Sequence, residues 1–411
     1  MLACVPPGRG ASGVTVCAMG ATVCAACPTG CVCQCVPRKK KDMMRMMLGT
    51  AALGAALRAP VPAATGLRGA APPRAAAAAV SQEVAPPLEW SPAGVRQRDG
   101  TLVSRSWTAV VDGAGGVETR YVAVGDAALP PVLLIHGFGA SSFHWRRNAN
   151  ALAAAGYRVY AIDLLGFGAS DKPLVDYGVD LWVAQCAAFL DAFAGGKHAV
   201  VAGNSIGGNV ALALAARRPD LVRGVASLNG AGTFSAAAAA AAEAAAARAA
   251  APAWRRAADE ALGAVAAAAK RFVVAASFVV TKQPARIRQV LRQVYPVAPE
   301  ACDDELVASI EFPARDRDAP EVFYRIVTRD AGGVDRSVEA FLDGLAAPLL
   351  LCWGEKDPWC TSAVGDRLLA AAEARGVAVE RASVDAGHCP NDEQPVATNA
   401  ALLEWMGRLK S

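Results

Sequence analysis

A regular alternation of short apolar runs with longer helical stretches constrains this chain more than any other feature. The run at 131–135 has the continuous hydrophobic character of a strand buried on both faces. Further short runs with strand character lie at 157–162, 198–204 and 222–229. Helical periodicity fills the intervals, at 143–155, 180–194 and 206–217. Strands that alternate with helices predict an α/β fold, with a mostly parallel sheet that helices cover on both faces. Two earlier β-like runs, 104–112 and 118–125, flank Asp112-Gly113, which is a hairpin signal.

The alternation stops near Gly232 and returns with a strand at 348–352, a helix at 362–375, a strand at 377–384 and a helix at 393–409. The signals in between are helical only, at 254–280, 284–294, 303–311 and 318–330, after an Ala-rich run at 235–251. Such a block predicts a helical cap over the carboxyl ends of the strands, where these folds bind ligands. A low-complexity insertion is the alternative for the Ala-rich run. We therefore expect a core at 86–231 and 346–411, with a cap at 232–345.

Residues 1–85 form a leader without helix or strand periodicity. The first 80 residues contain nine Lys and Arg but one acidic residue, which gives them a net charge of +8. Arg-rich, acid-poor leaders are typical of organelle transit peptides, although composition does not separate a chloroplast from a mitochondrion. Two alternatives concern its beginning. In the first, Cys24 and Cys27, with three cysteines close behind, have a spacing that could bind a metal ion. In the second, translation starts near Met43, and residues 1–42 are absent from the protein.

The charge and the cysteines of the remaining chain exclude some classes of protein. The whole chain has a net charge of +4, so the part after the leader is mildly acidic at −4 and gives no indication of nucleic-acid binding. Five scattered cysteines favour reduced side chains over a disulfide framework. The most apolar stretch, 199–216, is interrupted by glycines and polar residues, so we expect a soluble or at most peripheral protein.

The motif Gly203-Asn-Ser205-Ile-Gly207 carries the chemistry. It follows an expected strand and opens an expected helix. A G-x-S-x-G sequence in that context forms a sharp turn that lifts the Ser hydroxyl above the sheet, where it can attack a carbonyl group. Side chains at either glycine would collide across so tight a turn. The sequence therefore predicts Ser205 as a nucleophile.

His136-Gly137-Phe138-Gly139 ends the apolar run at 131–135. In folds with this nucleophile turn, the loop after that strand supplies one amide of an oxyanion hole, and the residue after the nucleophile supplies the other. We assign these amides to Phe138 and Ile206. An ordinary strand-to-loop turn is the alternative for His136-Gly137.

A Ser nucleophile needs a base, and the chain has four histidines. His136 belongs to the proposed oxyanion loop, and His198 precedes a strand at the end opposite the nucleophile. His144 opens a helix, where we expect a partly exposed or substrate-facing side chain. His388 alone follows the last strand, in a loop at the carboxyl edge of the sheet. It is therefore the predicted general base.

The acid of such a site lies between the nucleophile and the base in the chain. Asp357 follows the strand at 348–352 and is the predicted acid, whereas Glu355 is interpreted as structural and Asp385 as a solvated charge. Cys360 and Cys389 lie near the acid and the base. They are interpreted as packing residues, with a redox switch as the alternative. This chemistry requires no metal and no organic cofactor.

Together these motifs resemble the plastid and cyanobacterial α/β-hydrolases, the group that includes pheophytinase and chlorophyll dephytylase. The resemblance spans roughly residues 100–410 and rests on His136-Gly-Phe-Gly139, Phe143-His-Trp145, Asp163-Leu-Leu-Gly-Phe-Gly168, Gly203-Asn-Ser-Ile-Gly-Gly208, Trp353-Gly-Glu-Lys-Asp-Pro-Trp359, Gly387-His-Cys-Pro390 and the cap segment 282–295. The chain departs from the group at Asn391, where His is frequent, and at Ile206, where Leu is frequent. The Ala-rich cap entry has no clear counterpart.

The resemblance implies the same three residues, Ser205, Asp357 and His388, as a catalytic triad. It also implies ester hydrolysis in the chloroplast on a bulky apolar substrate such as a phytyl ester, with peripheral association with the thylakoid membrane as a further expectation. Hydrolysis of a lipid acyl ester or of a C–C bond stays open. So does a protein of another class, a hydrolase-fold receptor that binds a ligand with little turnover. The sequence leaves the oligomeric state open as well.

Overall fold

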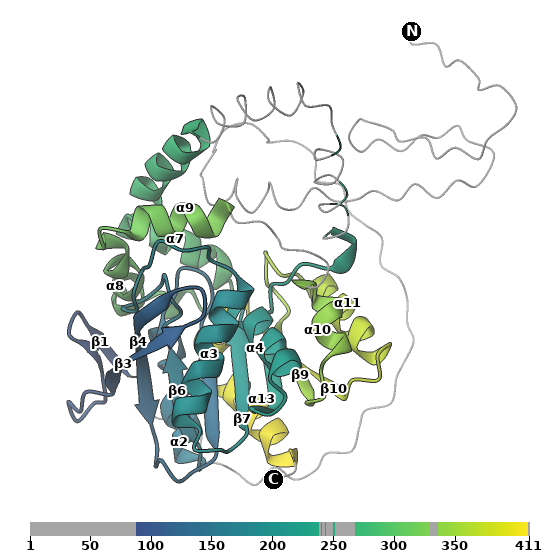
Figure 1. The fold of residues 1–411 in the computed structure, drawn as a ribbon. Helices are drawn as coiled ribbons and strands as arrows, with labels where there is room; N and C mark the ends of the chain where they lie inside the picture. The colour runs from purple at the N-terminus through teal and green to yellow at the C-terminus, as the bar shows by residue number, and fades with distance from the viewer. Residues whose placement is uncertain are drawn as a thin grey trace, which may run out of the picture.

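A computed structural model describes residues 88–237, 268–328 and 336–409, together with residues 240, 243 and 250. The predictions for the leader, and most of those for the Ala-rich run and for 254–267, lie outside the described residues. The described chain folds around one large sheet, with the segments from 268 to 328 gathered above one end of it (Figure 1).

The large sheet has eight strands in the order β10-β9-β8-β7-β5-β6-β4-β3. The antiparallel hairpin of β3 and β4 pairs with β6 at one edge, and all other pairings are parallel. The prediction of a mostly parallel sheet is thereby confirmed. The strands are β3 (Ser104–Val111), β4 (Gly115–Val124), β5 (Pro131–Ile135), β6 (Arg158–Ile162), β7 (Ala199–Asn204), β8 (Val222–Leu228), β9 (Leu349–Gly354) and β10 (Val379–Val384).

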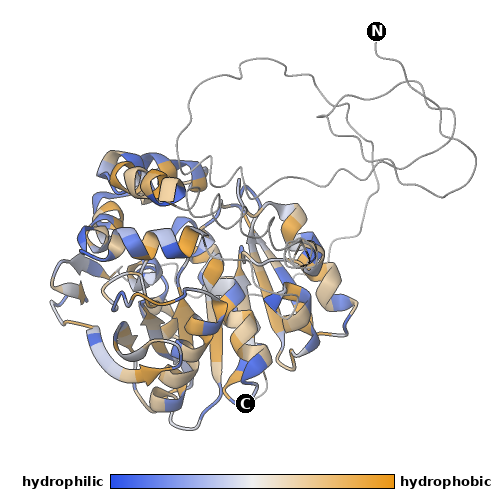
Figure 2. Cartoon of the chain, turned by 45° about the horizontal axis from the view of Figure 1, so that its top comes forward, coloured by the Kyte–Doolittle hydropathy of each residue, from blue (hydrophilic) through white to orange (hydrophobic). Residues whose placement is uncertain are grey.

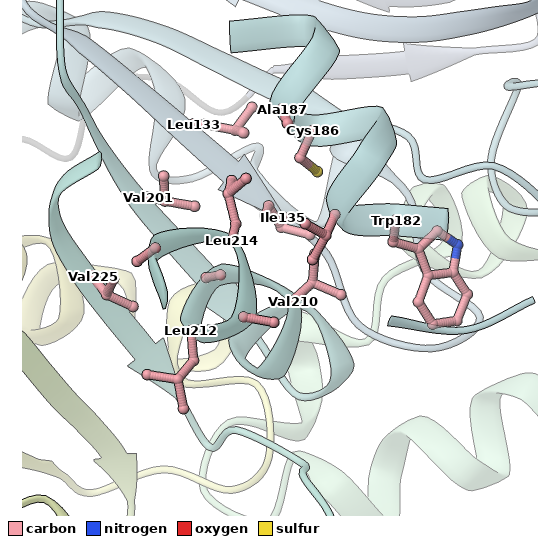
Figure 3. Packing of buried hydrophobic residues seen from close by; sticks show 14 of the residues in the cluster. Leu133, Ile135, Trp182, Cys186, Ala187, Val201, Val210, Leu212, Leu214 and Val225 are labelled. Carbon is pink, nitrogen blue, oxygen red and sulfur yellow. The ribbon is translucent and has the colours of Figure 1, made fainter. Parts of the chain in front are cut away.

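Both faces of the sheet are largely buried at its centre, which explains why the central strands are mostly apolar. Side chains alternate between the two faces of a strand, and those of β5 divide accordingly. Leu133 and Ile135 pack into one core with α3 (Val179–Phe193) and α4 (Ile206–Arg217) (Figure 3). Val132 and Leu134 pack into a second core with α2 (Ala149–Ala154) and α13 (Pro395–Arg408). The prediction of helices on both faces is also confirmed.

Two helices that the sequence predicted as continuous are each divided. The stretch 143–155 contains a 3₁₀ turn, η1 (Ser142–Trp145), followed by α2. The stretch 393–409 contains the end of α12 (Pro390–Glu393) and then α13. Pro395 lacks the N–H that a continuous helix would need, so a new helix begins there. The two-stranded sheet of β1 (Glu89–Ser91) and β2 (Gly94–Arg96) was not predicted, because three-residue strands are too short to show periodicity.

The described residues of the inserted segment form helices and turns and include no strand. Residues 268–281 form a helix, and α7 (Pro284–Val294), α8 (Asp304–Glu311) and α9 (Ala319–Thr328) follow, with two 3₁₀ turns, η2 (Pro299–Ala301) and η3 (Pro313–Arg315), between them. These helices lie above the sheet in Figure 1. We use the term cap for residues 268–328. The next helix, α10 (Val338–Asp343), contacts α4 and α11 (Ser362–Glu373) instead. Among the described helices, none is both long and apolar enough to cross a membrane.

Candidate active site

Ser205 lies on the turn between β7 and α4, where the backbone is strained. Its φ of 55° and ψ of −119° fall in a region that non-glycine residues rarely adopt. The flanking glycines explain how the turn closes. A Cβ atom on Gly203 would lie 2.1 Å from the Gly207 carbonyl oxygen, and one on Gly207 would lie 2.3 Å from the Ile135 carbonyl oxygen. The strand-turn-helix geometry on which the sequence argument depended is therefore present.

The Ser205 side chain is 8 % exposed and borders a cavity of about 200 Å³. The floor of this cavity comes from loops at the carboxyl ends of the strands, including Gly137–Ala140 and His388. Its roof comes from the cap, with Phe278, Ile287 and Phe323 among the contributing side chains. Lys172 and Lys282 also border it, whereas no carboxylate does within the described chain. The surroundings of Ser205 are thus largely apolar.

His388 borders the same cavity and is paired with Asp357. Its Nδ1 lies 2.6 Å from the Asp357 Oδ2, and both side chains are buried. The backbone of His388 is held from two sides: its N–H donates to the Val294 carbonyl at the end of α7 (3.0 Å), and its carbonyl accepts from the Asn204 Nδ2 (2.8 Å). Asn204 precedes Ser205, so one hydrogen bond links the loop of His388 directly to the nucleophile turn.

Asp357 follows β9 and accepts two further hydrogen bonds. The backbone N–H of Trp359 donates to its Oδ1 (2.7 Å), and the Asn229 Nδ2 donates to its Oδ2 (2.8 Å). Asn229 is fully buried, has a φ of 45°, and also accepts from the Gly354 N–H through Oδ1 (2.8 Å). The sequence reasoning missed Asn229. Its only local signal is the Asn-Gly pair directly after a buried strand, which is typical of a left-handed turn.

Glu355 and Asp385, the two other carboxylates considered for the role of the acid, lie in different environments from Asp357. Glu355 accepts hydrogen bonds from Ser383 (2.6 Å) and Arg381 (2.9 Å), and Asp385 forms an exposed ion pair with Lys356. Burial raises the pKa of both the Cys360 and the Cys389 thiol well above its ordinary value. Potential ligand atoms of Asp357, Cys360 and His388 lie within 4.8 Å of one another, so these residues could hold a metal ion in chemical terms, but a protonated thiol is a poor ligand.

The loop after β5 is held next to Ser205 by His136. The His136 ring is fully buried, its Nδ1 donates to the Gly137 carbonyl (2.7 Å), and its Nε2 accepts from the Leu164 N–H (3.0 Å). Burial lowers the pKa of His136, which keeps the ring neutral. Phe138 borders the cavity, and Ile206 follows Ser205. The structure records no hydrogen bond from either backbone N–H to another described residue.

The two other histidines differ from each other. His198 is exposed at the beginning of β7, away from the cavity, as predicted. His144 is only 5 % exposed, so the expectation of a partly exposed side chain is wrong, although the residue does border the cavity. Its ring packs near that of Tyr295, with the His144 Nε2 2.6 Å from the Tyr295 hydroxyl. Tyr295 comes from the cap, 151 residues later in the chain, and no sequence pattern relates the two.

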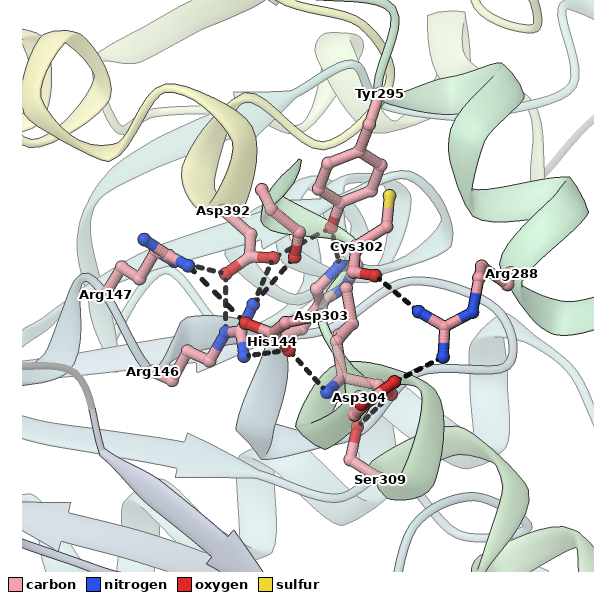
Figure 4. Close-up of polar contacts among 12 residues, drawn as sticks. His144, Arg146, Arg147, Arg288, Tyr295, Cys302, Asp303, Asp304, Ser309 and Asp392 are labelled. Carbon is pink, nitrogen blue, oxygen red and sulfur yellow. Dashed lines mark hydrogen bonds and ion pairs between the residues drawn. The ribbon is translucent and has the colours of Figure 1, made fainter. Parts of the chain in front are cut away.

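Tyr295 also belongs to a buried polar cluster that joins the cap to the core (Figure 4). Its hydroxyl donates to the Asp392 Oδ2 (3.1 Å), and the Arg146 Nε donates to the Asp392 Oδ1 (2.9 Å). Arg146 also donates to Asp303 at the start of α8 (2.8 Å). Asp392 and Arg146 are almost completely buried and compensate each other, and Arg147 pairs with Asp392 as well (3.3 Å).

The fold and the cavity define the class of this protein. Residues 130–395 match the family model described as the alpha/beta hydrolase fold, so the chain belongs to that family.

Particular relatives cover different parts of the chain. Chloroplastic pheophytinase of Arabidopsis thaliana is 28 % identical over 69 % of this chain and 62 % of its own length. The 2-hydroxy-6-oxo-6-(2'-aminophenyl)hexa-2,4-dienoic acid hydrolase of Metapseudomonas resinovorans is 38 % identical over 29 % of this chain and 41 % of its own length. In both cases the match covers less than two thirds of the relative.

Solved structures show the same fold. A thermophilic esterase from Thermogutta terrifontis has 21 % identity and a TM-score of 0.54, over 75 % of this chain and the whole of the esterase. At that identity the likeness concerns the fold alone. The comparisons therefore establish the α/β-hydrolase family and the fold.

Proposed function

We propose that this protein is a serine hydrolase that cleaves a carboxylic ester of a bulky apolar substrate through an acyl-enzyme. One observation carries the proposal. A Ser on a strained nucleophile turn and a His paired with a buried Asp border the same cavity. A Ser hydroxyl becomes a strong nucleophile when an oriented imidazole accepts its proton, and the carboxylate fixes the tautomer of that imidazole.

In the proposed reaction, His388 Nε2 accepts the Ser205 hydroxyl proton while Oγ forms a bond to the ester carbonyl carbon. The carbonyl π electrons move onto the oxygen, which the amides of Phe138 and Ile206 stabilise. When the intermediate collapses, the C–O bond to the alcohol breaks, and the protonated His388 gives its proton to the leaving oxygen. Water then attacks the acyl-enzyme by the same steps and releases the acid and Ser205. Asp357 stays ionised and stabilises the imidazolium.

Replacing Ser205 tests this assignment. We expect Ser205→Ala to lose both fluorophosphonate labelling and turnover of 4-nitrophenyl esters, with a rate decrease of at least about 10³-fold. Ser106→Ala, at an exposed site on β3, is the matched control and should keep both activities. Turnover that survives in the Ser205 variant would refute the proposal. A protein that binds apolar esters without any turnover would instead support the hydrolase-fold receptor.

The cavity supports an apolar substrate, since aromatic and aliphatic side chains of the cap form much of its roof. The relation to pheophytinase supports a phytyl ester of a chlorophyll derivative, and the relation to the dienoic acid hydrolase favours C–C bond cleavage as a second candidate. Incubation with pheophytin, chlorophyll, galactolipids and a dienoic ring-cleavage product distinguishes them. Freed phytol supports the phytyl ester, freed fatty acid supports a lipid substrate, and release of a carboxylic acid from the dienoic compound supports C–C cleavage.

We further propose a chloroplast location with peripheral association with the thylakoid membrane. The relation to a chloroplastic protein and the basic, acid-poor leader support the organelle. The cap, which shows both hydrophobic and hydrophilic segments in Figure 2, includes the helix at 268–281. This helix exposes Phe272, Val279 and Val280 and also carries the exposed Lys270, a combination suited to an anionic lipid surface. A fluorescent fusion of the full chain should colocalise with chlorophyll, and salt should release it from membranes. Colocalisation with a mitochondrial marker would overturn the location.

A further inference from the structure

A row of aromatic rings borders the cavity and runs from the proposed oxyanion loop into the cap. The ring centroids of Phe138 and Phe323 lie 6.0 Å apart, and those of Phe323 and Phe278 lie 5.0 Å apart. All three residues border the cavity that Ser205 borders as well. Because Phe138 also carries one of the amides assigned to the oxyanion, the row begins next to the proposed reaction centre. An extended apolar group that leads away from the scissile carbonyl is therefore expected to lie along these rings.

The row ends at Lys282, which directly follows the cap helix at 268–281. Lys282 borders the same cavity, and its Nζ lies 5.7 Å from the centroid of the Phe278 ring. The negative face of an aromatic ring attracts a cation over this distance. The Lys282 side chain is neither fully buried nor fully exposed. The far end of the aromatic row therefore carries a positive charge that lies against a ring of the cavity wall.

Lys282 differs from Lys172, the other cationic residue that borders the cavity. The Lys172 Nζ donates to the carbonyl oxygens of Gly168 (3.0 Å) and Ser170 (3.2 Å), and it lies 3.7 Å from the Asp316 Oδ2. Lys282, in contrast, has no hydrogen bond or ion pair from its Nζ to another described residue. The charge of Lys172 is thus compensated within the protein, whereas no carboxylate of the described chain compensates the charge of Lys282.

Resting on the proposed function, we propose that the substrate is an anionic amphiphile, whose apolar body separates the scissile ester from a carboxylate or phosphate group that pairs with Lys282. A wholly apolar body that filled the cavity would remove water from the ammonium group without replacing its hydrogen bonds, which is unfavourable. An anionic group at the far end replaces them with a charge-assisted hydrogen bond. Since a Lys ammonium acts as a compact point charge, a carboxylate and a phosphate both satisfy it. Lys282 is then a specificity-determining residue.

Pairs of 4-nitrophenyl esters that differ only at the far end of the acyl chain test this proposal. One member of each pair is the plain octanoate, dodecanoate or hexadecanoate, and the other carries a terminal carboxylate. The measured quantity is the ratio of kcat/KM of the carboxylated ester to that of the plain ester. Lys282→Met removes the charge but keeps an apolar stem, and Lys282→Arg keeps the charge. Lys197→Met is the matched control, because it removes the charge of an exposed Lys that does not border the cavity.

For at least one chain length, we expect this ratio to fall about fivefold from the wild-type protein to Lys282→Met, which is the effect of losing one partly exposed ion pair. The ratio should be largely kept in Lys282→Arg and in Lys197→Met, and added salt should lower it in the wild-type protein. Ratios that do not differ between the wild-type protein and Lys282→Met at any chain length would overturn the proposal. An equal fall in Lys197→Met would also overturn it, because the cause would then be the net charge of the protein.

Binding to the Ser205→Ala protein does not depend on turnover and therefore separates this inference from the proposed function. The ligands are dimethyl dodecanedioate, the monomethyl ester with its free carboxylate, and the matching methyl ester with a terminal phosphate. By isothermal titration calorimetry, we expect at least one anionic ester to bind about fivefold more tightly than the neutral diester, and Lys282→Met to abolish this preference. The anion that is preferred identifies the group.

A preference that is absent, or that survives in Lys282→Met, would overturn the inference. If the wild-type protein cleaves no ester but the preference is found, the proposed function fails and the anion site at Lys282 stands. If esters are cleaved without any preference for an anionic end, the proposed function stands and this inference fails.

Discussion

At the scale of single residues, the strained backbone conformations lie at the proposed active site. Among the described residues other than glycine, Ser205 and Asn229 have positive φ angles. Ser205 carries the proposed nucleophile, and Asn229 holds Asp357 through Nδ2. Strained conformations of this kind cost on the order of 1–3 kcal/mol and tend to cluster at functional sites. The strained positions are therefore the proposed nucleophile itself and a residue that holds the proposed acid.

The neutral state of His144 leads to a pH-dependent stability. Its pKa is about 4 in the folded protein and 6.5 in a model compound, so the unfolded chain binds the proton more readily between these values. The contribution is fully present above pH 6.5 and is lost as the pH falls toward 4. We expect the wild-type protein to lose on the order of 3 kcal/mol more unfolding free energy than His144→Gln between pH 7 and pH 4. Urea unfolding of both proteins measures this, and parallel pH curves would contradict it.

The candidate site was only partly predictable from single residues. Ser205, Asp357 and His388 stand out because each follows an expected strand, and parallel strands bring their carboxyl ends to one edge. Asn229, Tyr295 and Asp392 do not stand out. Their roles depend on contacts between segments far apart in the chain, such as the 128 residues between Asn229 and Asp357, and no local pattern encodes those.

At the scale of secondary-structure elements, the nucleophile turn depends on close backbone contact. We expect Gly203→Ala to lower the unfolding free energy by about 3 kcal/mol or more and to abolish turnover, because the new methyl group would overlap the Gly207 carbonyl oxygen. Gly116→Ala in β4 is the matched control. A Cβ atom there meets nothing within 4 Å, so its stability should change by less than about 0.5 kcal/mol. Thermal unfolding and ester turnover test both variants, and equal behaviour would contradict the steric argument.

The elements that the sequence predicts best are those that the core determines. The strands β5 to β8 are mostly apolar because helices bury both their faces, and their predicted bounds differ from the observed ones by one residue at most. The elements that were missed or divided are determined by short-range chemistry instead. Pro395 ends one helix and begins another, and β1 and β2 form through pairing with each other, which leaves no periodic signal.

At the scale of the whole molecule, a buried ionic cluster joins the cap to the core. Removing one partner of a buried ion pair leaves the other charge uncompensated, at a cost of about 3–5 kcal/mol. We expect a loss of unfolding free energy toward the lower end of that range for Arg146→Gln, since Asp392 is completely buried but keeps a second pairing with Arg147 at 3.3 Å. Arg408→Gln breaks the exposed pairs of Arg408 with Glu380 and Glu404 and should cost no more than about 1 kcal/mol. Urea unfolding compares them, and equal losses would show that burial does not decide the difference.

The hydrogen bond between the His388 amide and the Val294 carbonyl restricts how relatives of this protein can diversify. It ties the loop of the proposed base to the far end of α7, and Glu393 adds a second tie by accepting from the amides of both Gly387 and Val297. Insertions before residue 284 leave this junction untouched, whereas a residue gained or lost between α7 and the junction would displace the imidazole. We therefore expect the cap before residue 284 to vary among relatives with different substrates. The end of α7 and the loop of His388, in contrast, are expected to change only together.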